Sequence, residues 1–228
     1  MSAPPIRPTN RQRAGLIATR VARQALAVGV GSGLRRYQPE RRSAKDFERV
    51  YASGRFDYFS EAYELPRYSA LLGYLRMYPG TPTVLDVGCG PGLLRQLLTR
   101  EDFSAYHGID ISAEAIKKAS PLADDRTSFS LGDVLTSDPP PADVVVLNEV
   151  LYYISPPSAL LDHVASLVTP GGFVLASIWR HGGDRALWRL LDRAFVRVSA
   201  CRVRPEGNPY NHRGFRVSWH RARDGGPA

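Results

Sequence analysis

Five short apolar runs alternate with helical stretches between residues 83 and 180, and this alternation restricts the fold more than any other feature of the chain. The stretches between the runs, at 91–100, 112–119 and 157–168, carry apolar residues at helical spacing. Short apolar strands connected through helices form parallel sheets that are covered on both faces. We therefore expect an α/β fold with a doubly wound sheet. The expected strands are TVLDV (83–87), SAYHGIDI (104–111), TSFSLGDV (127–134), ADVVVLNEV (142–150) and GGFVLASIW (171–179).

The segment after the fifth run predicts an antiparallel addition to this sheet. RALWRLLDRAF (185–195) has the spacing of a helix, and residues 196–204 and 213–220 alternate between polar and apolar. PEGNPYNH, which joins these two segments, is typical of a loop or hairpin. The sheet is therefore expected to be mostly parallel, with an antiparallel strand near the C-terminus.

Two helices are expected ahead of the first strand. SAKDFERVYASGRFDYFSEAYELPRYSALLGYLRMY (43–78) has helical spacing that is interrupted around Ser53 and Gly54. The buried face of the second helix is marked by Leu71, Leu72 and Leu75. The chain is thus expected to divide into a basic tail, a helical segment and a sheet core, at 1–42, 43–80 and 81–228.

Basic charge is concentrated at the start of the chain, although the net charge of the whole is +8. Residues 1–39 carry seven arginines and no acidic residue, whereas the rest carries 23 basic and 22 acidic residues. Binding of nucleic acid across the main domain needs a basic surface. The nearly neutral body therefore argues against a nucleic-acid partner.

The arginine-rich stretch RAGLIATRVARQALAVGVGSGLRRY (13–37) leaves two interpretations open. It fits a helix packed on the domain or a frayed leader. It also fits a basic amphipathic helix that makes weak contact with an anionic membrane surface, or an arginine-rich targeting segment. No run of 18 apolar residues predicts a transmembrane helix. The two cysteines fit a reducing, cytoplasmic compartment, and the histidines show no metal-ligand spacing, so no metal is expected.

The turn that follows the first expected strand, VGCGPG, is the main functional signal. Gly88, Gly90 and Gly92 lie within five residues, directly after Asp86. Glycine in ordered structure costs backbone entropy, so this cluster indicates a tight turn or a ligand held against bare backbone. A dinucleotide site is disfavoured, because the spacing is G-x-G-x-G and because Asp86 would repel a pyrophosphate. A carboxylate at this position suits a ligand with a cationic group.

These motifs resemble those of the class I S-adenosylmethionine-dependent methyltransferases, which have a Rossmann-like fold. The acid followed by G-x-G-x-G resembles the first motif of that family. YHGIDIS, LGDV, ADVVVLNEVLYYI and LVTPGGFVLAS resemble its motifs at the second to fifth strands. The resemblance implies S-adenosylmethionine as cofactor and S-adenosylhomocysteine as product. NEVLYYI is also similar to small members that methylate sugars, lipo-oligosaccharides and secondary metabolites, such as nodulation N-methyltransferases.

The resemblance implies a position for each part of the cofactor. The ammonium group suits Asp86 and the carbonyl of Gly88, and the carboxylate suits the helix N-terminus that follows Gly92. The two ribose hydroxyls are expected to donate to Asp110.

The adenine is expected between Ile111 and Val134, with Asp133 accepting from its amino group. Gly90 and Cys89 complete the turn against the cofactor. We expect the Cys89 thiol to pack as a small side chain rather than act as a nucleophile.

The upstream stretch FDYFSEAYELPRY resembles the lid helices of small-molecule members. The resemblance implies that Tyr58 and Arg67 close over the methionine end, Arg67 by pairing with its carboxylate. Two simpler interpretations stay open, packing for Tyr58 and a surface position for Arg67.

The end of the fourth expected strand, LNEVLYY, supplies candidate catalytic groups. By the resemblance, Asn148 lies near the cofactor, and Glu149 either orients or deprotonates an acceptor or caps the next turn. Tyr152 and Tyr153 are candidates for an aromatic wall around the sulfonium, with one of the pair packing in the core. His181, after the fifth strand, is the histidine best placed to act as a base.

We therefore expect an enzyme that moves a methyl group from S-adenosylmethionine to an oxygen or nitrogen of a small molecule, such as a secondary metabolite, a sugar or a lipid-linked glycan. The alternative is a cofactor-binding protein of the same fold with a non-methylating or scaffold role. A nicotinamide oxidoreductase is disfavoured by the glycine spacing.

Overall fold

The computed structural model describes residues 43–180, 183–207 and 213–223. The expected basic tail, 1–42, lies outside the described residues together with its two interpretations, and so does His181. The described strands are β1 (Thr83–Val87), β2 (Ala105–Asp110), β3 (Thr127–Leu131), β4 (Ala142–Asn148), β5 (Val168–Trp179), β6 (Val196–Val203) and β7 (Phe215–Arg221).

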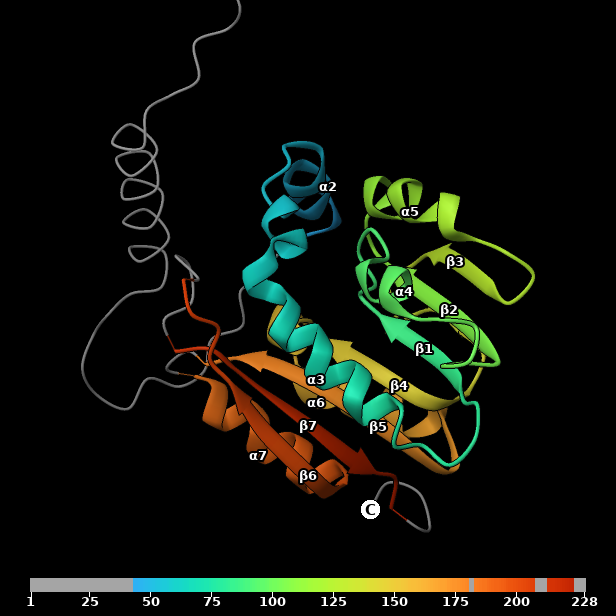
Figure 1. Cartoon of the computed structure of the whole chain (residues 1–228), viewed down its shortest axis with the longest axis vertical. Helices are drawn as coiled ribbons and strands as arrows, with labels where there is room; N and C mark the ends of the chain where they lie inside the picture. The colour runs from blue at the N-terminus through green and yellow to red at the C-terminus, as the bar shows by residue number, and fades with distance from the viewer. Residues whose placement is uncertain (1–42, 181–182, 208–212, 224–228) are drawn as a thin grey trace, which may run out of the picture.

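These strands form one sheet in the order β3-β2-β1-β4-β5-β7-β6 (Figure 1). The strands from β1 to β5 are parallel to their neighbours within that group, and β7 is antiparallel to both β5 and β6. The sequence prediction of a doubly wound, mostly parallel α/β sheet with an antiparallel strand near the C-terminus is confirmed.

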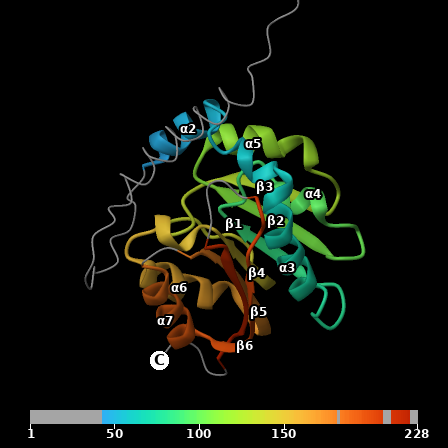
Figure 2. The ribbon, with the colours of Figure 1, turned by 60° about the vertical axis from the view of Figure 1, so that its left-hand side comes forward.

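Helices cover both faces of this sheet (Figure 1; Figure 2). The α-helices are α2 (Ala44–Ala52), α3 (Leu65–Leu75), α4 (Leu93–Leu97), α5 (Ala113–Ala119), α6 (Pro157–Leu167) and α7 (Asp184–Ala194). Short 3-10 turns lie between them, at η1 (Asp57–Ser60), η2 (Ala62–Glu64), η3 (Ser120–Leu122) and η4 (Leu151–Tyr153). Residues of α3 and α4 share one hydrophobic cluster with the sheet, and residues of α6 and α7 share the other.

The central strands are mostly apolar because they contact both clusters. Successive side chains of a strand point to opposite faces of the sheet. Val84 and Val146 accordingly pack in the cluster of α3 and α4, whereas Leu85 and Val145 pack in the cluster of α6 and α7. All four are at most 2% exposed, which explains why these strands appear in the sequence as continuous apolar runs.

Three expected boundaries are shifted where the backbone enters the left-handed region. Gly92 has φ 78°, so α4 begins at Leu93 and is shorter than the helix expected over 91–100. Glu149 has φ 61°, so β4 ends at Asn148 rather than at residue 150. β5 begins at Val168, before the expected start, and includes Gly171 at φ 79° beside an irregular register with β4.

The two expected helices ahead of the sheet are present as α2 and α3. The first ends at Ala52, directly before the predicted break, and Gly54 follows with φ 66°. In α3, Leu71 and Leu75 are buried as expected, whereas Leu72 is half-buried. Tyr68, one turn before Leu71, completes the buried face instead.

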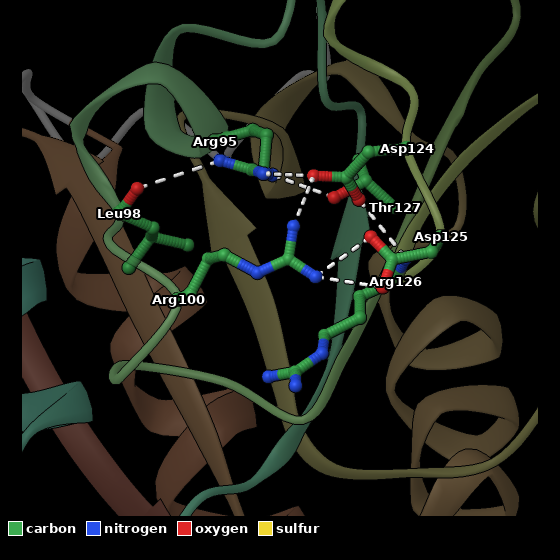
Figure 3. Close-up of polar contacts among 7 residues, drawn as sticks. All are labelled: Arg95, Leu98, Arg100, Asp124, Asp125, Arg126 and Thr127. Atoms are coloured by element: carbon green, nitrogen blue, oxygen red, sulfur yellow. Dashed lines mark hydrogen bonds and ion pairs between the residues drawn. The ribbon is translucent and has the colours of Figure 1, made fainter.

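A cluster of arginines and aspartates fixes the turn that leads into β3 (Figure 3). The guanidinium of Arg95 donates to Asp124 at 3.1 Å and to Thr127 at 2.7 Å. Arg100 pairs with Asp125 at 2.7 Å and lies 3.7 Å from Asp124. These side chains join α4 to the start of β3, far from the carboxyl ends of the strands.

The order of strands reverses between β1 and β4, because β2 and β3 extend to one side of β1 while β4 and β5 extend to the other. In open α/β sheets, ligands bind beyond the carboxyl ends of the strands at such a switch point. The fold therefore directs attention to the loops after β1, β2 and β4. Within the described ranges, no helix has the length and apolar character needed to cross a membrane.

Candidate active site

A cavity of about 460 Å³ lies at this switch point. Its floor is formed by the loop after β1 and by the ends of β2 and β4. The helical segment before β1 contributes aromatic side chains to its wall. The loop after β3 contributes Asp133 and Val134. The other lining residues include Asp86, Gly88, Cys89, Gly90, Asp110, Ile111, Asn148, Glu149 and, from the helical segment, Phe47, Tyr51, Phe56, Phe59, Arg67 and Tyr68.

The glycine turn has a backbone that other residues would strain. Gly88 has φ 69° and Gly90 has φ 56°, both in the left-handed region. A Cβ on Gly88 would lie 2.7 Å from Val150 Cγ2, and one on Gly90 would lie 2.9 Å from the Tyr51 hydroxyl. Both positions therefore require glycine. Gly92, also expected at the site, is not among the described lining residues and sits against Leu122 instead.

The two oxygens of the buried Asp86 carboxyl group differ in their hydrogen bonding. Its Oδ2 accepts a 2.5 Å hydrogen bond from the Tyr106 hydroxyl. Its Oδ1 is buried and has no hydrogen-bond partner among the described residues. Burial raises the pKa of Asp86 from 3.8 to about 7, although the bond from Tyr106 acts in the other direction. A cationic group bound in this cavity would satisfy the free oxygen.

Asp110 ties the glycine turn to the end of β2. Its Oδ2 accepts from the backbone N–H of Gly90 at 2.8 Å, and its Oδ1 accepts from that of Ser112 at 2.9 Å. Burial raises the pKa of Asp110, and these two bonds oppose that shift. A carboxylate has about four acceptor positions, so Asp110 keeps acceptor capacity for hydroxyl groups of a ligand.

The part of the cavity that lies beyond the ends of β2 and β3 has apolar walls and is open to solvent at Asp133. Val134 is buried and Ile111 is half-buried, and both line the cavity. Asp133 is exposed and accepts from the N–H of Leu135 at 3.0 Å. Cys89 is buried in the turn, and burial raises the pKa of its thiol. The thiol therefore stays protonated, as the sequence prediction of a packed Cys89 requires.

Comparison with known proteins gives the family. A family model described as a methyltransferase domain matches residues 19–222. The chain belongs to the class I S-adenosylmethionine-dependent methyltransferases.

A ubiquinone biosynthesis O-methyltransferase of Xylella fastidiosa is 36% identical over 100 residues, which are 41% of this chain and 40% of the relative. The chain thus matches less than half the length of that relative. The N-methyltransferase NodS of Bradyrhizobium japonicum, solved with S-adenosylhomocysteine, superimposes with a TM-score of 0.69 over 79% of this chain and 98% of that one, at 19% identity. A 1,6-didemethyltoxoflavin-N1-methyltransferase of Burkholderia thailandensis gives 0.65 over 98% and 94%, also at 19% identity. These two likenesses support the fold.

Arg67 is buried within α3, so the surface position that the sequence left open is wrong. Its guanidinium is 1% exposed and donates to Glu64 at 3.0 and 3.2 Å. It also donates to Asn148, and it lies 4.4 Å from the centroid of the Tyr68 ring. A buried arginine that binds Glu64 in its own helical segment and Asn148 at the end of β4 joins that segment to the sheet at the cavity wall.

Glu149 accepts hydrogen bonds on both of its oxygens. Ser177 donates to Oε1 at 2.7 Å, while the Tyr152 hydroxyl and the Trp179 N–H donate to Oε2 at 2.8 and 3.1 Å. Ser177 lies opposite Asn148 in the register of β4 and β5, and its hydroxyl is also 2.8 Å from the Asn148 oxygen. Glu149 therefore joins the ends of both strands to the turn η4.

The paired tyrosines divide between the core and the cavity. Tyr153 lines the cavity, whereas Tyr152 packs in the cluster of α6 and α7 and is not among the described lining residues. The two rings nevertheless stay in contact, with their centroids 4.5 Å apart. Tyr58 is also absent from the described lining and packs against Phe59, with ring centroids 4.4 Å apart.

Tyr106, Ser177 and Glu64 were not identified from the sequence, although each contacts a candidate site residue. Tyr106 lies inside β2 and Ser177 inside β5, so their roles depend on how neighbouring strands align. Tyr106 pairs with Val84, two residues before Asp86. Glu64 precedes Arg67 by three residues on the same helical segment, and that i,i+3 spacing is the one local signal available. Within the described ranges, no group of three histidine, cysteine or acidic residues could hold a metal ion.

Proposed function

We propose that the protein transfers the methyl group of S-adenosylmethionine to an oxygen or nitrogen atom of a small-molecule acceptor. The observation that carries the cofactor half of this proposal is the unpartnered Oδ1 of Asp86, a buried carboxylate oxygen in a cavity-lining residue. The cofactor brings an ammonium group that would satisfy this oxygen. Family membership and the S-adenosylhomocysteine bound to NodS support the same assignment.

The rest of the cavity fits the other parts of the cofactor. Asp110 keeps acceptor capacity for the two ribose hydroxyls after binding Gly90 and Ser112. Ile111 and Val134 provide apolar surfaces for the adenine, and Asp133 provides an acceptor near the open end. The bare backbone of Gly88 and Gly90 leaves room for the methionine part.

An aromatic chamber beside this region fits the acceptor. Phe47, Phe56, Phe59 and Tyr153 line the cavity on the side of the lid segment. The rings of Phe47 and Tyr153 meet edge to face at 5.2 Å, and those of Phe56 and Phe59 lie 5.1 Å apart. An enclosed apolar wall of this kind suits a small, largely apolar acceptor. The toxoflavin enzyme of similar fold, solved with 1,6-didemethyltoxoflavin bound, supports a small-molecule acceptor.

When bound, S-adenosylmethionine would supply a methyl group on a positively charged sulfur. An acceptor lone pair would take up the methyl carbon as the carbon–sulfur bond breaks, S-adenosylhomocysteine would leave, and the acceptor's proton would pass to solvent. The protein holds the acceptor and the cofactor together and excludes water. In this proposal, Glu149 and Asn148 position the acceptor through their network with Ser177 and Arg67. Glu149 acts by orientation, because three donors leave its carboxylate about one free acceptor position. Tyr152 holds Glu149, and Tyr153 faces the sulfonium.

A transfer assay tests the proposal. The full chain is incubated with methyl-labelled S-adenosylmethionine and a panel of phenols, amines and amino sugars, and label in the product is measured. Label transferred to at least one acceptor supports methyl transfer. The protein could instead bind the cofactor tightly and transfer no label, either to the panel or to the small molecules of a cell extract. That result would favour a non-methylating protein of the same fold.

A further inference from the structure

The lid helix α2 contacts the body of the protein through a specific partner, α5 (Figure 1; Figure 2). Phe47 and Tyr51 project from α2 into the lining of the cavity. The helix has its own N-terminal cap, since Ser43 and Asp46 bind each other's backbone N–H groups. The first turn of α2 is therefore capped from within the helix, and the contacts with α5 fix the position of α2 on the body.

Glu48 makes the polar contact at one end of this interface. Its two carboxylate oxygens accept from the backbone N–H groups of Ala113 and Glu114, the first two residues of α5, the second bond at 3.1 Å. The next N–H, that of Ala115, is bound by the side chain of Ser112 at 3.2 Å. The carboxylate of Glu48 thus completes the first turn of α5 from a helix 65 positions earlier in the chain.

Lys118 makes a reciprocal contact at the other end. Its ammonium donates to the backbone carbonyl of Tyr51, in the last turn of α2, at 2.8 Å. A negative group from α2 therefore lies at the start of α5, and a positive group from α5 lies at the end of α2. Both arrangements are favoured by the dipoles of the helices.

This interface is directly connected to the groups assigned to the cofactor. Ser112, which precedes Ala113, donates its backbone N–H to Asp110, and the same carboxylate binds Gly90. Tyr51 places its hydroxyl over Gly90, 2.9 Å from where a Cβ would lie. Docking of α2 on α5 therefore brings the lid into contact with the glycine turn and sets its distance from Asp110.

We propose that Glu48 is a positioning residue that fastens α2 over the bound cofactor, so that cofactor binding and lid closure stabilise each other. This inference rests on the proposed binding of S-adenosylmethionine. A ligand that contacts Tyr51 only when α2 is docked on α5 binds the docked state more tightly than the undocked state. By thermodynamic linkage, any change that destabilises docking also lowers the affinity for the ligand. Glu48 does not touch the reacting atoms, and it acts through the position of Phe47 and Tyr51.

The test compares S-adenosylhomocysteine binding by the wild-type chain, Glu48→Gln and Lys118→Met, using calorimetry and thermal denaturation with and without the ligand. Glu101→Gln is the matched control, because it makes the same chemical change at an exposed position in the loop after α4. We expect the dissociation constant to rise about fivefold or more in both lid variants, in the range of typical coupling energies. We expect the control to match the wild type.

A purely structural role gives a different pattern. It would lower the melting temperature of Glu48→Gln by the same amount with and without S-adenosylhomocysteine, and the dissociation constant would stay at the wild-type value. That result overturns the inference while leaving the proposed function intact. If Glu48→Gln fails to fold, Lys118→Met alone decides between these outcomes. Absence of binding by the folded wild-type chain would overturn the proposed function and this inference together.

Discussion

Tyr106 donates a 2.5 Å hydrogen bond to Oδ2 of Asp86, and the other oxygen of that buried carboxyl group has no partner among the described residues. The phenol fixes the carboxyl group against β2 without neutralising it. The remaining oxygen belongs to a residue of the cavity wall. A buried carboxylate with one unpartnered oxygen suits a cationic ligand. Protonation of Asp86 should therefore weaken the binding of such a ligand.

The pKa of Asp86, raised by burial to about 7, predicts that cofactor affinity depends on pH. Below pH 7 the carboxyl group is mostly protonated and cannot pair with an ammonium group. The affinity for S-adenosylhomocysteine should therefore rise as the pH increases from about 6 to 8. Calorimetry across this range measures the effect. Asp86→Asn should bind more weakly and lose this pH dependence, and an unchanged pH profile in the variant would contradict the role of Asp86.

The same raised pKa predicts the opposite trend for the ligand-free protein. The folded state binds the Asp86 proton more tightly than the unfolded state, whose carboxyl group titrates near 3.8. The stability contributed by this group is full below pH 3.8 and is lost as the pH rises towards 7. Comparing urea unfolding of the wild type and Asp86→Asn between pH 4 and 7 isolates this contribution, since the variant lacks it.

Gly88→Ala should destabilise the protein more than Gly171→Ala, although both residues have a positive φ. The left-handed backbone costs an alanine about 1–2 kcal/mol at either position. At Gly88 the new Cβ also meets Val150 at 2.7 Å, whereas nothing lies within 4 Å at Gly171. We expect the crowding to cost a further ~1–3 kcal/mol in urea unfolding. Equal losses would show that the turn can relax around a side chain.

Arg67→Met should lower the free energy of unfolding by about 3–5 kcal/mol, because it leaves the carboxylate of Glu64 buried without its guanidinium partner. Adding Glu64→Gln removes that charge, so the double variant should recover much of the lost free energy of unfolding. Urea unfolding of both single variants and the double variant gives the coupling between the two side chains. Additive losses would mean that the pair does not act as a unit.

The strand pattern and the glycine turn were predictable because burial and backbone conformation leave local signals. Central strands such as β1 contact helices on both faces, so their sequences are mostly apolar rather than alternating. Asp86 is the penultimate residue of β1 and Asp110 the last residue of β2, and the carboxyl ends of these neighbouring parallel strands lie at one edge of the sheet. The family's motifs added the assignment of each acid to a part of the cofactor, and those individual assignments remain predictions.

The contacts that hold the site together were not predictable in the same way. Tyr106 reaches Asp86 and Ser177 reaches Glu149 through the register between strands, which the sequence does not specify residue by residue. Glu48 and α5 are 65 positions apart, and nothing in either local pattern links them. Tyr152 and Tyr153 differ by one position in a 3-10 turn, too small a difference for the sequence to show which ring enters the cavity.

The central claim, that this cavity holds the adenosyl cofactor, is tested most directly by calorimetric titration of S-adenosylhomocysteine into the wild-type chain and into Asp110→Asn. The account predicts one ligand per wild-type chain, and an affinity loss of about 2–3 kcal/mol in the variant, because the amide is a poorer acceptor for the ribose hydroxyls and for the N–H groups of Gly90 and Ser112. Circular dichroism establishes that both proteins are folded. No binding by the folded wild type, or equal binding by the variant, would contradict the account.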